Sequence, residues 1–440
     1  MIDKNLLDFS AGVQDKCVKN DNISDILFKE YGVNRGLRDE NGKGVLTGLT
    51  KISKIIPFDG KGGQLWYRGY TISDLIKNLN AEEYGFEKAA YLLLFGDMPD
   101  DDEYKAFFDT ISKCRKLPAN FTRDIIMKAA SEDVMNSMTR SILALASYDN
   151  RTKISELGNI ISQCIYLISV FPMLAVYSYH AYNHYTNNAS MYIHNPKPGL
   201  SAAENFLYML RPDNKYSELE AKVLDTALIL HMEHGGGNNS TFTTRVVTSS
   251  GSDTYATIGA AMSSLKGPKH GGANIKVVEM MRDIYDNIDD RNDDEEIKSY
   301  LSKILDKQAF DNQGLIYGMG HAIYSVSDPR EQILKSYAKM LAAEKNMTEE
   351  LNLYQKVENL APVVIAEKRK IYKGVSPNVD FYSGFVYKML NIPIELYTPL
   401  FAVARIVGWC SHRLEEIIGS GKIIRPSYMS VMEENSVDTQ

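Results

Sequence analysis

The segment H231-M-E-H-G-G-G-N-N-S240, followed by G267-P-K-H-G-G-A-N274, is the part of the chain from which its fold and chemistry are best inferred. His231 and His234 lie three residues apart at the end of an amphipathic pattern that three glycines interrupt. His270 lies in a second turn, rich in glycine and proline. Three of the eight histidines therefore stand beside backbone breaks. Such breaks let side chains project into a cleft, so this segment predicts helices that end at a polar site.

The composition limits the class of protein. A chain of 440 residues, 44% hydrophobic and 24% charged, is typical of two globular domains or one large helical body. The net charge of −7 argues against a nucleic-acid-binding protein that neutralises phosphates. The four cysteines form no C-x-x-C motif, which favours reduced thiols in a cytosolic protein. The acidic N-terminus resembles neither a secretory signal nor a mitochondrial presequence, so we expect a cytoplasmic protein.

One apolar segment, residues 160–177, raises the question of a membrane span. It contains Ser162, Gln163, Ser169 and Pro172, and it is too short for a continuous apolar crossing. We therefore expect a buried core helix and no membrane partner.

The rest of the chain predicts a mainly α-helical protein. Residues 45–70 alternate β-branched or aromatic runs with glycines, which predicts a small N-terminal β-hairpin. Helical periodicity dominates from Thr71 onward, with Gly and Pro at the breaks. We expect a long polar loop over residues 179–200, a helical subdomain over residues 296–376, and a last pair of helices after Pro377.

His231, Glu233 and His234 have two interpretations. An H-x-x-H pair with a carboxylate between the histidines is able to bind a metal. The alternative is a pair of core or helix-end histidines that bond to carbonyl groups. The metal interpretation needs a third ligand at a suitable spacing, and the sequence has no H-E-x-x-H motif or second H-x-x-H motif.

Two other polar residues also have a structural and a functional interpretation. His270 precedes a helix start, which lowers the proton affinity of an imidazole. A neutral His270 is able to donate a hydrogen bond to a carbonyl oxygen, and the alternative is a solvated turn histidine. Asp380 follows a proline at a helix start, so it is either an N-cap or a general base.

Three arginines, Arg330, Arg405 and Arg425, each stand within a motif rather than in a charged stripe. Arg405 lies in the otherwise apolar segment L-F-A-V-A-R-I-V-G-W. A lone arginine on an apolar face needs an anion, and its planar guanidinium group suits a carboxylate. These arginines therefore predict a carboxylate ligand.

Together, these segments resemble the citrate synthase family. Nine segments match in the family's order over roughly residues 45–428. They are G-V-L-T-G-L-T-K-I-S with L-W-Y-R-G-Y, A-A-Y-L-L-L-F-G-D-M-P, S-A-A-E-N-F-L-Y-M-L, H-M-E-H-G-G-G-N, G-P-K-H-G-G-A-N, G-M-G-H-A-I-Y-x-x-x-D-P-R, P-N-V-D-F-Y-S-G, the Arg405 helix and I-I-R-P. The resemblance implies a homodimer of two-domain helical subunits, with a large domain from residues 1–272 and 383–440 and a small domain from residues 273–382.

The resemblance also implies a reaction of the tricarboxylic acid cycle, in which acetyl-CoA condenses with oxaloacetate. By this resemblance, Asp380 takes a methyl proton from acetyl-CoA and His270 stabilises the enol. His321 polarises the oxaloacetate ketone and protonates its oxygen. Hydrolysis of citryl-CoA then releases citrate and CoA. The chain would thus be an acyltransferase that turns the acyl group into an alkyl group, with no cofactor and no metal.

The substrate contacts follow from the same resemblance. Oxaloacetate is held by His234, Arg330 and Arg405, with Arg425 contributed by the second subunit. Phe401 matches an aromatic residue that packs against oxaloacetate. Oxaloacetate has two carboxylates, which accounts for three arginines in a chain of negative net charge.

Contacts with CoA are expected from Lys370 and Lys373 and from the glycine-flanked loop at Gly318 and Gly320, where a ligand is able to approach the backbone closely. The sequence departs from the family here. Four residues after His321 the family often has a basic residue, whereas this chain has Ser325.

Three alternatives stay open at this stage. The closest is a 2-methylcitrate synthase that uses propionyl-CoA, because one methylene changes binding by only about 1–3 kcal/mol. The second is a metal-binding helical protein that uses the His231–His234 segment. The third is a helical scaffold without catalytic activity.

Overall fold

The computed structural model divides the chain into two compact units, residues 1–49 and 50–440. It describes residues 11, 13–14, 18–19, 23–39, 43–58, 60, 62–79, 84–320, 324, 327–369, 375–419 and 421–432. In the first unit, Ser24 caps the short helix α2 (Asp25–Glu30) by accepting a hydrogen bond from the Leu27 amide. No residue of α2 is buried, so this helix adds no apolar core.

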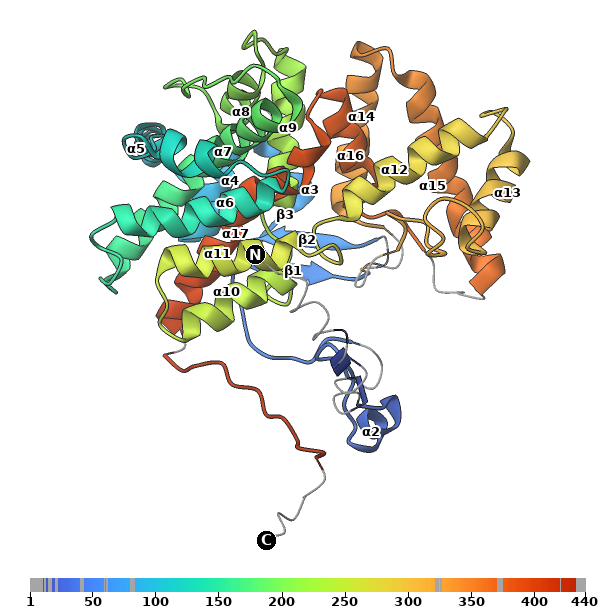
Figure 1. Cartoon of the computed structure of the whole chain (residues 1–440), viewed down its shortest axis with the longest axis horizontal. Helices are drawn as coiled ribbons and strands as arrows, with labels where there is room; N and C mark the ends of the chain where they lie inside the picture. The colour runs from blue at the N-terminus through green and yellow to red at the C-terminus, as the bar shows by residue number, and fades with distance from the viewer. Residues whose placement is uncertain are drawn as a thin grey trace. The chain divides into compact units, whose positions relative to one another are not determined.

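The second unit begins with a small antiparallel sheet of three strands in the order β1-β2-β3 (Figure 1). Strand β1 (Ser53–Ile56) pairs with β2 (Gln64–Tyr67), which confirms the expected hairpin. The sequence did not predict β3 (Tyr70–Thr71), which pairs with β2 across a two-residue turn. Both turn residues, Arg68 and Gly69, have positive φ angles of 45° and 94°. This geometry matches the right-handed twist of neighbouring strands.

Helices form the rest of this unit (Figure 1). Their bounds are α3 (Ile72–Leu79), α4 (Phe86–Phe95), α5 (Asp101–Cys114), α6 (Val134–Leu145), α7 (Leu157–Asn187), α8 (Ala202–Leu210), α9 (Glu218–His231), α10 (Asn239–Ser249), α11 (Thr254–Lys266), α12 (Ala273–Asn287), α13 (Asp294–Leu305), α14 (Pro329–Glu344), α15 (Thr348–Arg369), α16 (Val379–Met389) and α17 (Tyr397–Gly419). Short turns η1 (Thr122–Ile126), η2 (Met127–Ala129), η3 (Ala146–Tyr148) and η4 (Ile394–Leu396) lie between them. The mainly α-helical fold is therefore confirmed.

Helix α7 is the buried core helix expected over residues 160–177. It is long and apolar enough to cross a membrane, but 78% of its most apolar window is buried inside the protein. The prediction of a polar loop over residues 179–200 was wrong for its first part, because α7 continues to Asn187. The buried residues His180 and Ala181 hold this last stretch of α7 against the core, and Asn188 ends the helix at a φ of 55°.

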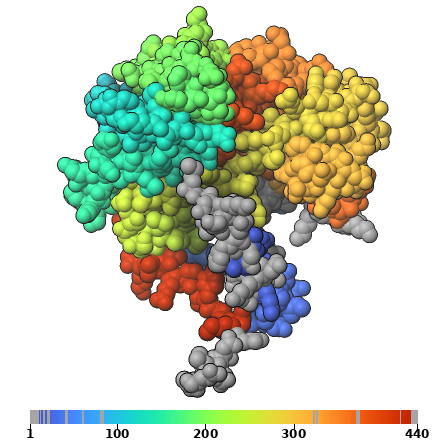
Figure 2. Space-filling model, viewed as in Figure 1, coloured from blue at the N-terminus to red at the C-terminus, as the bar shows by residue number. Residues whose placement is uncertain are grey.

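The helices of the second unit pack in two groups. Helix α17 lies at the centre of one group and contacts α4, α7, α9, α10 and α11. In the other group, α12 and α14 pack against α16, and α13 packs against α15. Figure 2 shows the yellow and orange residues of this second group gathered together. The predicted boundaries at residues 273 and 382 stay a prediction.

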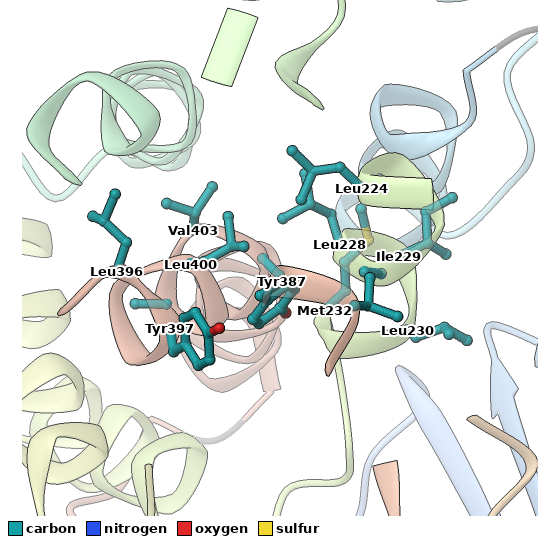
Figure 3. Close-up of a cluster of buried hydrophobic side chains, with 14 of the residues drawn as sticks. Leu224, Leu228, Ile229, Leu230, Met232, Tyr387, Leu396, Tyr397, Leu400 and Val403 are labelled. Carbon is teal, nitrogen blue, oxygen red and sulfur yellow. The ribbon is translucent and has the colours of Figure 1, made fainter. Parts of the chain in front are cut away.

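Apolar side chains join α9, α16 and α17 next to the predicted site. Figure 3 shows Tyr387 of α16 between two side chains at the end of α9, Leu228 and the C-cap residue Met232, and two at the start of α17, Tyr397 and Leu400. All five side chains are at most 3% exposed. The helix ends that carry the predicted functional residues are therefore held by a continuous core.

A buried ion pair, Arg115–Glu87, stabilises the packing of α4, α5 and α8. Arg115 Nη2 donates to Glu87 Oε1 over 2.9 Å, and the Ala202 amide at the start of α8 donates to the same oxygen over 2.8 Å. The two side chains are only 5% and 1% exposed. Glu87 therefore holds together α4, the end of α5 and the start of α8.

Replacing Glu87 by alanine is expected to lower the free energy of unfolding by about 3–5 kcal/mol, because Arg115 is left as an unpaired buried charge. Equilibrium urea unfolding followed by circular dichroism measures this change. The control is Glu350→Ala, which removes the more exposed pair Lys388–Glu350. A loss from Glu87→Ala no larger than that of the control would contradict this account of the ion pair.

Candidate active site

The glycine-interrupted end of α9 forms one wall of the site. Helix α9 ends at His231, and Gly235 follows with a φ of 85°. This turn brings His234 to Tyr324, with 3.3 Å between His234 Nε2 and the Tyr324 hydroxyl. His234 is 8% exposed. The glycines therefore turn His234 away from the helix axis and toward Tyr324.

Glu233 holds this turn rather than a metal ion. Its Oε1 accepts hydrogen bonds from Ser53 Oγ at 2.8 Å and from the Gly235 amide at 2.5 Å, and it lies 3.0 Å from His412 Nε2. Burial alone would raise the pKa of Glu233, but His412 and these donors lower it to about 2. Among the described residues, no three His, Cys, Asp or Glu side chains are grouped as metal ligands would be. Glu233 is therefore a structural anion.

Arg405 is a buried cation with an open nitrogen. Its Nε donates to the His231 carbonyl over 2.7 Å, and its guanidinium carbon lies 4.7 Å from the centre of the Phe401 ring. Its Nη1 is buried and has no hydrogen-bond partner in the part of the chain that the structure describes. Burial lowers the pKa of Arg405 to about 10, although Glu233 opposes this shift. Because a buried cation without a partner is costly, this arrangement fits an anionic ligand.

Arg330 has a carboxylate partner already. Its Nε and Nη2 donate to the two oxygens of Asp328 over 3.0 and 2.7 Å. Asp328 also caps α14, because the Arg330 amide donates to Asp328 Oδ1 over 3.0 Å. Burial would lower the pKa of Arg330, but Asp328 raises it above its ordinary value. This guanidinium group is therefore charged and fixed in orientation.

Asp380 lies in the first turn of α16. The interpretation of Asp380 as the N-cap was wrong, because Asn378 Oδ1 accepts a hydrogen bond from the Asp380 amide over 3.0 Å and caps the helix. This leaves the Asp380 carboxylate free of the capping role. Burial raises its pKa to about 6, with Arg330 and Arg405 opposing that shift and Asp328 adding to it. A carboxylate with this pKa suits proton transfer near neutral pH.

His270 lies in the turn before α12, beside two polar side chains. Its Nε2 is 3.1 Å from Ser240 Oγ, and Trp409 Nε1 donates to the same oxygen over 3.1 Å. Burial lowers the pKa of His270 to about 4, and Arg405 adds to this shift. His270 is therefore neutral at physiological pH. The sequence predicted a lowered proton affinity from the helix start, whereas the main cause in the structure is burial.

In the loop before His321, packing requires a glycine at position 318. Gly318 has a φ of 77°, and a Cβ atom there would lie 2.8 Å from the Val277 side chain and 2.9 Å from the Phe381 ring. Gly320 donates its amide to the Ser376 carbonyl over 2.8 Å. This loop is thus fastened to the segment that leads into α16.

Several predicted residues lie outside the described part of the chain. They are His321, Ser325, Lys370 and Lys373. Two basic residues directly before Lys370 are described: Lys368 donates to Asp306, and Arg369 donates to the Gly314 carbonyl. These two side chains are therefore engaged in contacts within the protein.

Of the other two predicted residues, Phe401 lies at the site and Arg425 lies on the surface. Phe401 packs against His231 with the two rings tilted by 36° and their centroids 4.5 Å apart. Arg425 is exposed in the extended segment after α17, where the Ile424 amide donates to Ser249 Oγ over 3.0 Å. Among the described residues, no hydrogen bond or ion pair joins Arg425 to the other site residues of its own chain.

The structure thus brings most of the predicted site together. The electric fields of Arg330 and Arg405 act on Asp380 and on His231, and the field of Arg405 acts on His270. Sequence analysis missed the supporting residues, which are Ser240, Asn378, Trp409, Tyr324 and His412. Tyr324, Asn378 and Trp409 lie inside the matched segments, and that position was the only signal for them.

Known proteins resemble this chain over most of its length. The family model described as citrate synthase, C-terminal domain, matches residues 38–427. A citrate synthase from Synechocystis is 34% identical over 87% of this chain and 89% of its own, and a 2-methylcitrate synthase from Shewanella oneidensis is 31% identical over 88% and 92%. The citrate synthase from Thermoplasma acidophilum, solved as a ternary complex with carboxymethyl coenzyme A and oxaloacetate, has a TM-score of 0.75 and 28% identity, with 92% of this chain and 98% of the other covered. The chain therefore belongs to the citrate synthase family, whose members are acyltransferases.

Proposed function

We propose that the chain condenses acetyl-CoA with oxaloacetate and hydrolyses the resulting citryl-CoA to citrate and CoA. The observation that carries this proposal is that Asp380 lies within the electric fields of the two buried arginines and has a pKa raised to about 6, while Arg405 also acts on the neutral His270. A base, an uncharged hydrogen-bond donor and cationic groups for carboxylates are the parts that such a condensation needs. The reaction needs no cofactor beyond its substrates.

Oxaloacetate binding follows from the two arginines. The open Nη1 of Arg405 would receive one carboxylate, and Phe401 would pack against the substrate beneath that guanidinium group. Arg330, oriented by Asp328, would bind a carboxylate through the nitrogen that Asp328 leaves open. His234 would donate a further hydrogen bond. Charge-assisted bonds of this kind are about twice as strong as neutral ones.

Enol formation assigns separate roles to Asp380 and His270. Asp380 would take a proton from the methyl group, while His270 would donate a hydrogen bond to the thioester oxygen. Ser240 holds the His270 ring in place. Its Oγ lies 3.1 Å from His270 Nε2 and accepts a hydrogen bond from Trp409 Nε1 over 3.1 Å, while it donates its own proton to Asn238 Oδ1 over 2.9 Å. These contacts would keep the imidazole in a fixed orientation beside the thioester oxygen.

Condensation and hydrolysis complete the sequence. The enol carbon bonds to the ketone carbon of oxaloacetate, and His321 would give a proton to the ketone oxygen. Water then adds to the thioester carbon of citryl-CoA and the carbon–sulfur bond breaks. One water proton goes to the CoA sulfur, and the other is released when the new carboxyl group ionises. CoA contacts are proposed for Gly318, Gly320, Lys370 and Lys373.

Several wider features belong to the same proposal. Residues 273–382 would form a small domain that closes over both substrates and excludes water until hydrolysis. The exposed position of Arg425 is compatible with a homodimer in which this arginine enters the site of the second subunit. The enzyme would act in the cytoplasm, in the tricarboxylic acid cycle.

The pH dependence of kcat/KM for oxaloacetate is expected to show an acid limb near pH 6. Below that pH Asp380 is protonated and unable to act as a base, because burial raises its pKa to about 6 from an ordinary value of 3.8. His270 stays neutral across this range, since its pKa is lowered to about 4. Initial rates in a series of buffers at saturating acetyl-CoA measure the limb. A midpoint near pH 4 would contradict the assignment of Asp380.

The experiment that tests the proposed function is thiol release from acetyl-CoA and from propionyl-CoA in the presence of oxaloacetate. We expect a higher kcat/KM with acetyl-CoA. A higher value with propionyl-CoA would assign the chain to 2-methylcitrate synthesis, which a relative at 31% identity makes a specific alternative. Release from neither thioester by a folded protein would refute both.

A further inference from the structure

One buried carboxylate, Asp328, touches both halves of the proposed chemistry. It caps α14 and binds the Arg330 guanidinium group through both oxygens, as described above. Its Oδ2 also accepts the Val379 amide over 3.3 Å. Val379 is the first residue of α16, and Asp380 is the second. A single side chain, 0% exposed, therefore joins the arginine that would bind oxaloacetate to the helix start that carries the base.

This contact lies between segments that are far apart in sequence. Residues 328 and 379 are separated by 51 positions, and α14 and α16 pack directly against each other. The start of α16 has its own N-cap, Asn378, whose amide donates to the Gly318 carbonyl over 2.9 Å. Asp328 is thus not required to cap α16. Its bond to Val379 sets the position of that helix start relative to Arg330.

The charges around Asp380 come from three directions. Asp328 and Arg330 face it from the start of α14, Arg405 faces it from α17, and Tyr387 lies on α16 itself. A second charged group, Glu331, Lys335 and Glu358, packs around Tyr382 of α16 instead. Asp328 is the anion whose field acts on Asp380, so its charge makes that carboxylate a stronger base.

We infer that Asp328 is a positioning residue for this reaction, which fixes Arg330 and Asp380 relative to each other and keeps a negative charge beside the base. The inference rests on the proposed function. It separates two contributions of one side chain: geometry, through the bidentate pair and the Val379 bond, and charge, through the field at Asp380. The two are separable by substitution, because asparagine keeps the shape without the charge and glutamate keeps the charge without the geometry.

The test compares Asp328→Asn and Asp328→Glu with the wild-type protein. Asp328→Asn is expected to lower kcat/KM for oxaloacetate roughly 10- to 100-fold. The amide has one acceptor oxygen and no charge, so it loses the charge-assisted bidentate pair that orients Arg330, and a misplaced binding group has an effect of that size. Its acid limb is expected to move down by about 0.5–1 pH unit, because the like charge beside Asp380 is gone. Asp328→Glu is expected to lower kcat/KM while leaving the acid limb in place.

The matched control is Asp225→Asn, which changes another buried aspartate that binds a helix start. Asp225 accepts the amides of Gly85 and Phe86 over 2.7 and 3.2 Å, and it is not among the charges that act on Asp380. Its acid limb should match the wild type. Equal limbs in Asp328→Asn and the wild type, or the same shift in the control, would overturn the inference.

Circular dichroism and titration calorimetry with oxaloacetate distinguish the remaining outcomes. Weaker oxaloacetate binding by folded Asp328→Asn than by the wild type is expected, and equal binding would overturn the inference. A wild-type protein that binds oxaloacetate but releases no thiol would refute the proposed function alone. The calorimetric comparison would then decide the positioning role by itself. If Asp328→Asn does not fold, Asp328→Glu carries the same comparison.

Discussion

Asp380→Asn is expected to lower kcat for thiol release roughly 10²- to 10⁴-fold, because the amide is unable to take the methyl proton. Asparagine has nearly the same shape, and Asn378 rather than Asp380 caps α16. The helix start should therefore keep its structure. Stopped-flow and steady-state assays of thiol release with acetyl-CoA and oxaloacetate measure the change.

Oxaloacetate binding is the control for this variant. The groups proposed to hold oxaloacetate, Arg330 and Arg405, are both untouched, so calorimetry should find an affinity at least as high as that of the wild type. Removing the anion beside two arginines is not expected to weaken the binding of another anion. A variant that binds oxaloacetate and still turns over at more than a tenth of the wild-type rate would rule Asp380 out as the base.

The second large effect is expected from Arg405→Met. This change removes a buried guanidinium group whose Nη1 has no hydrogen-bond partner among the described residues, so the substrate carboxylate would lose a desolvated ionic bond. We expect kcat/KM for oxaloacetate to fall by roughly two to three orders of magnitude. Arg405→Lys should recover only part of this loss, because lysine keeps the charge without the planar fork.

Arg413 provides a matched control on the same helix. It is also buried on α17, and it donates to Thr248, Thr257 and the Ser252 carbonyl rather than facing the site. Arg413→Met is expected to lower the melting temperature while leaving the oxaloacetate KM near the wild-type value. If both methionine variants raise this KM equally, Arg405 acts through stability and not through binding.

Local signals made much of the fold predictable. The capping box of Ser217 and Glu220, the cap at Asp253 and the Asp328-Pro329 start of α14 all follow standard helix-start patterns. Each of these signals acts within a few residues, so it can be read from the sequence alone. The same is true of the glycine breaks beside His234 and His270.

The parts that were missed depend on distant partners. The residues of the Glu233–His412 contact are 179 positions apart, and those of the Ser240–Trp409 contact are 169 positions apart. No local pattern specifies such pairs, which is why the sequence offered a metal interpretation for Glu233. The end of α7 was missed for a related reason. Its residues are polar, and the packing of His180 against the core is a tertiary contact that the local sequence does not reveal.

The most direct test of the central claim is to supply [2-¹³C]acetyl-CoA and oxaloacetate and to follow the label by carbon NMR. The account predicts that the methyl label appears in a methylene carbon of citrate, with one free CoA thiol for each citrate formed. It also predicts that Asp380→Asn forms far less citrate under the same conditions. Label that stays in acetyl-CoA, or that appears as free acetate, would contradict the claim that this site forms a carbon–carbon bond.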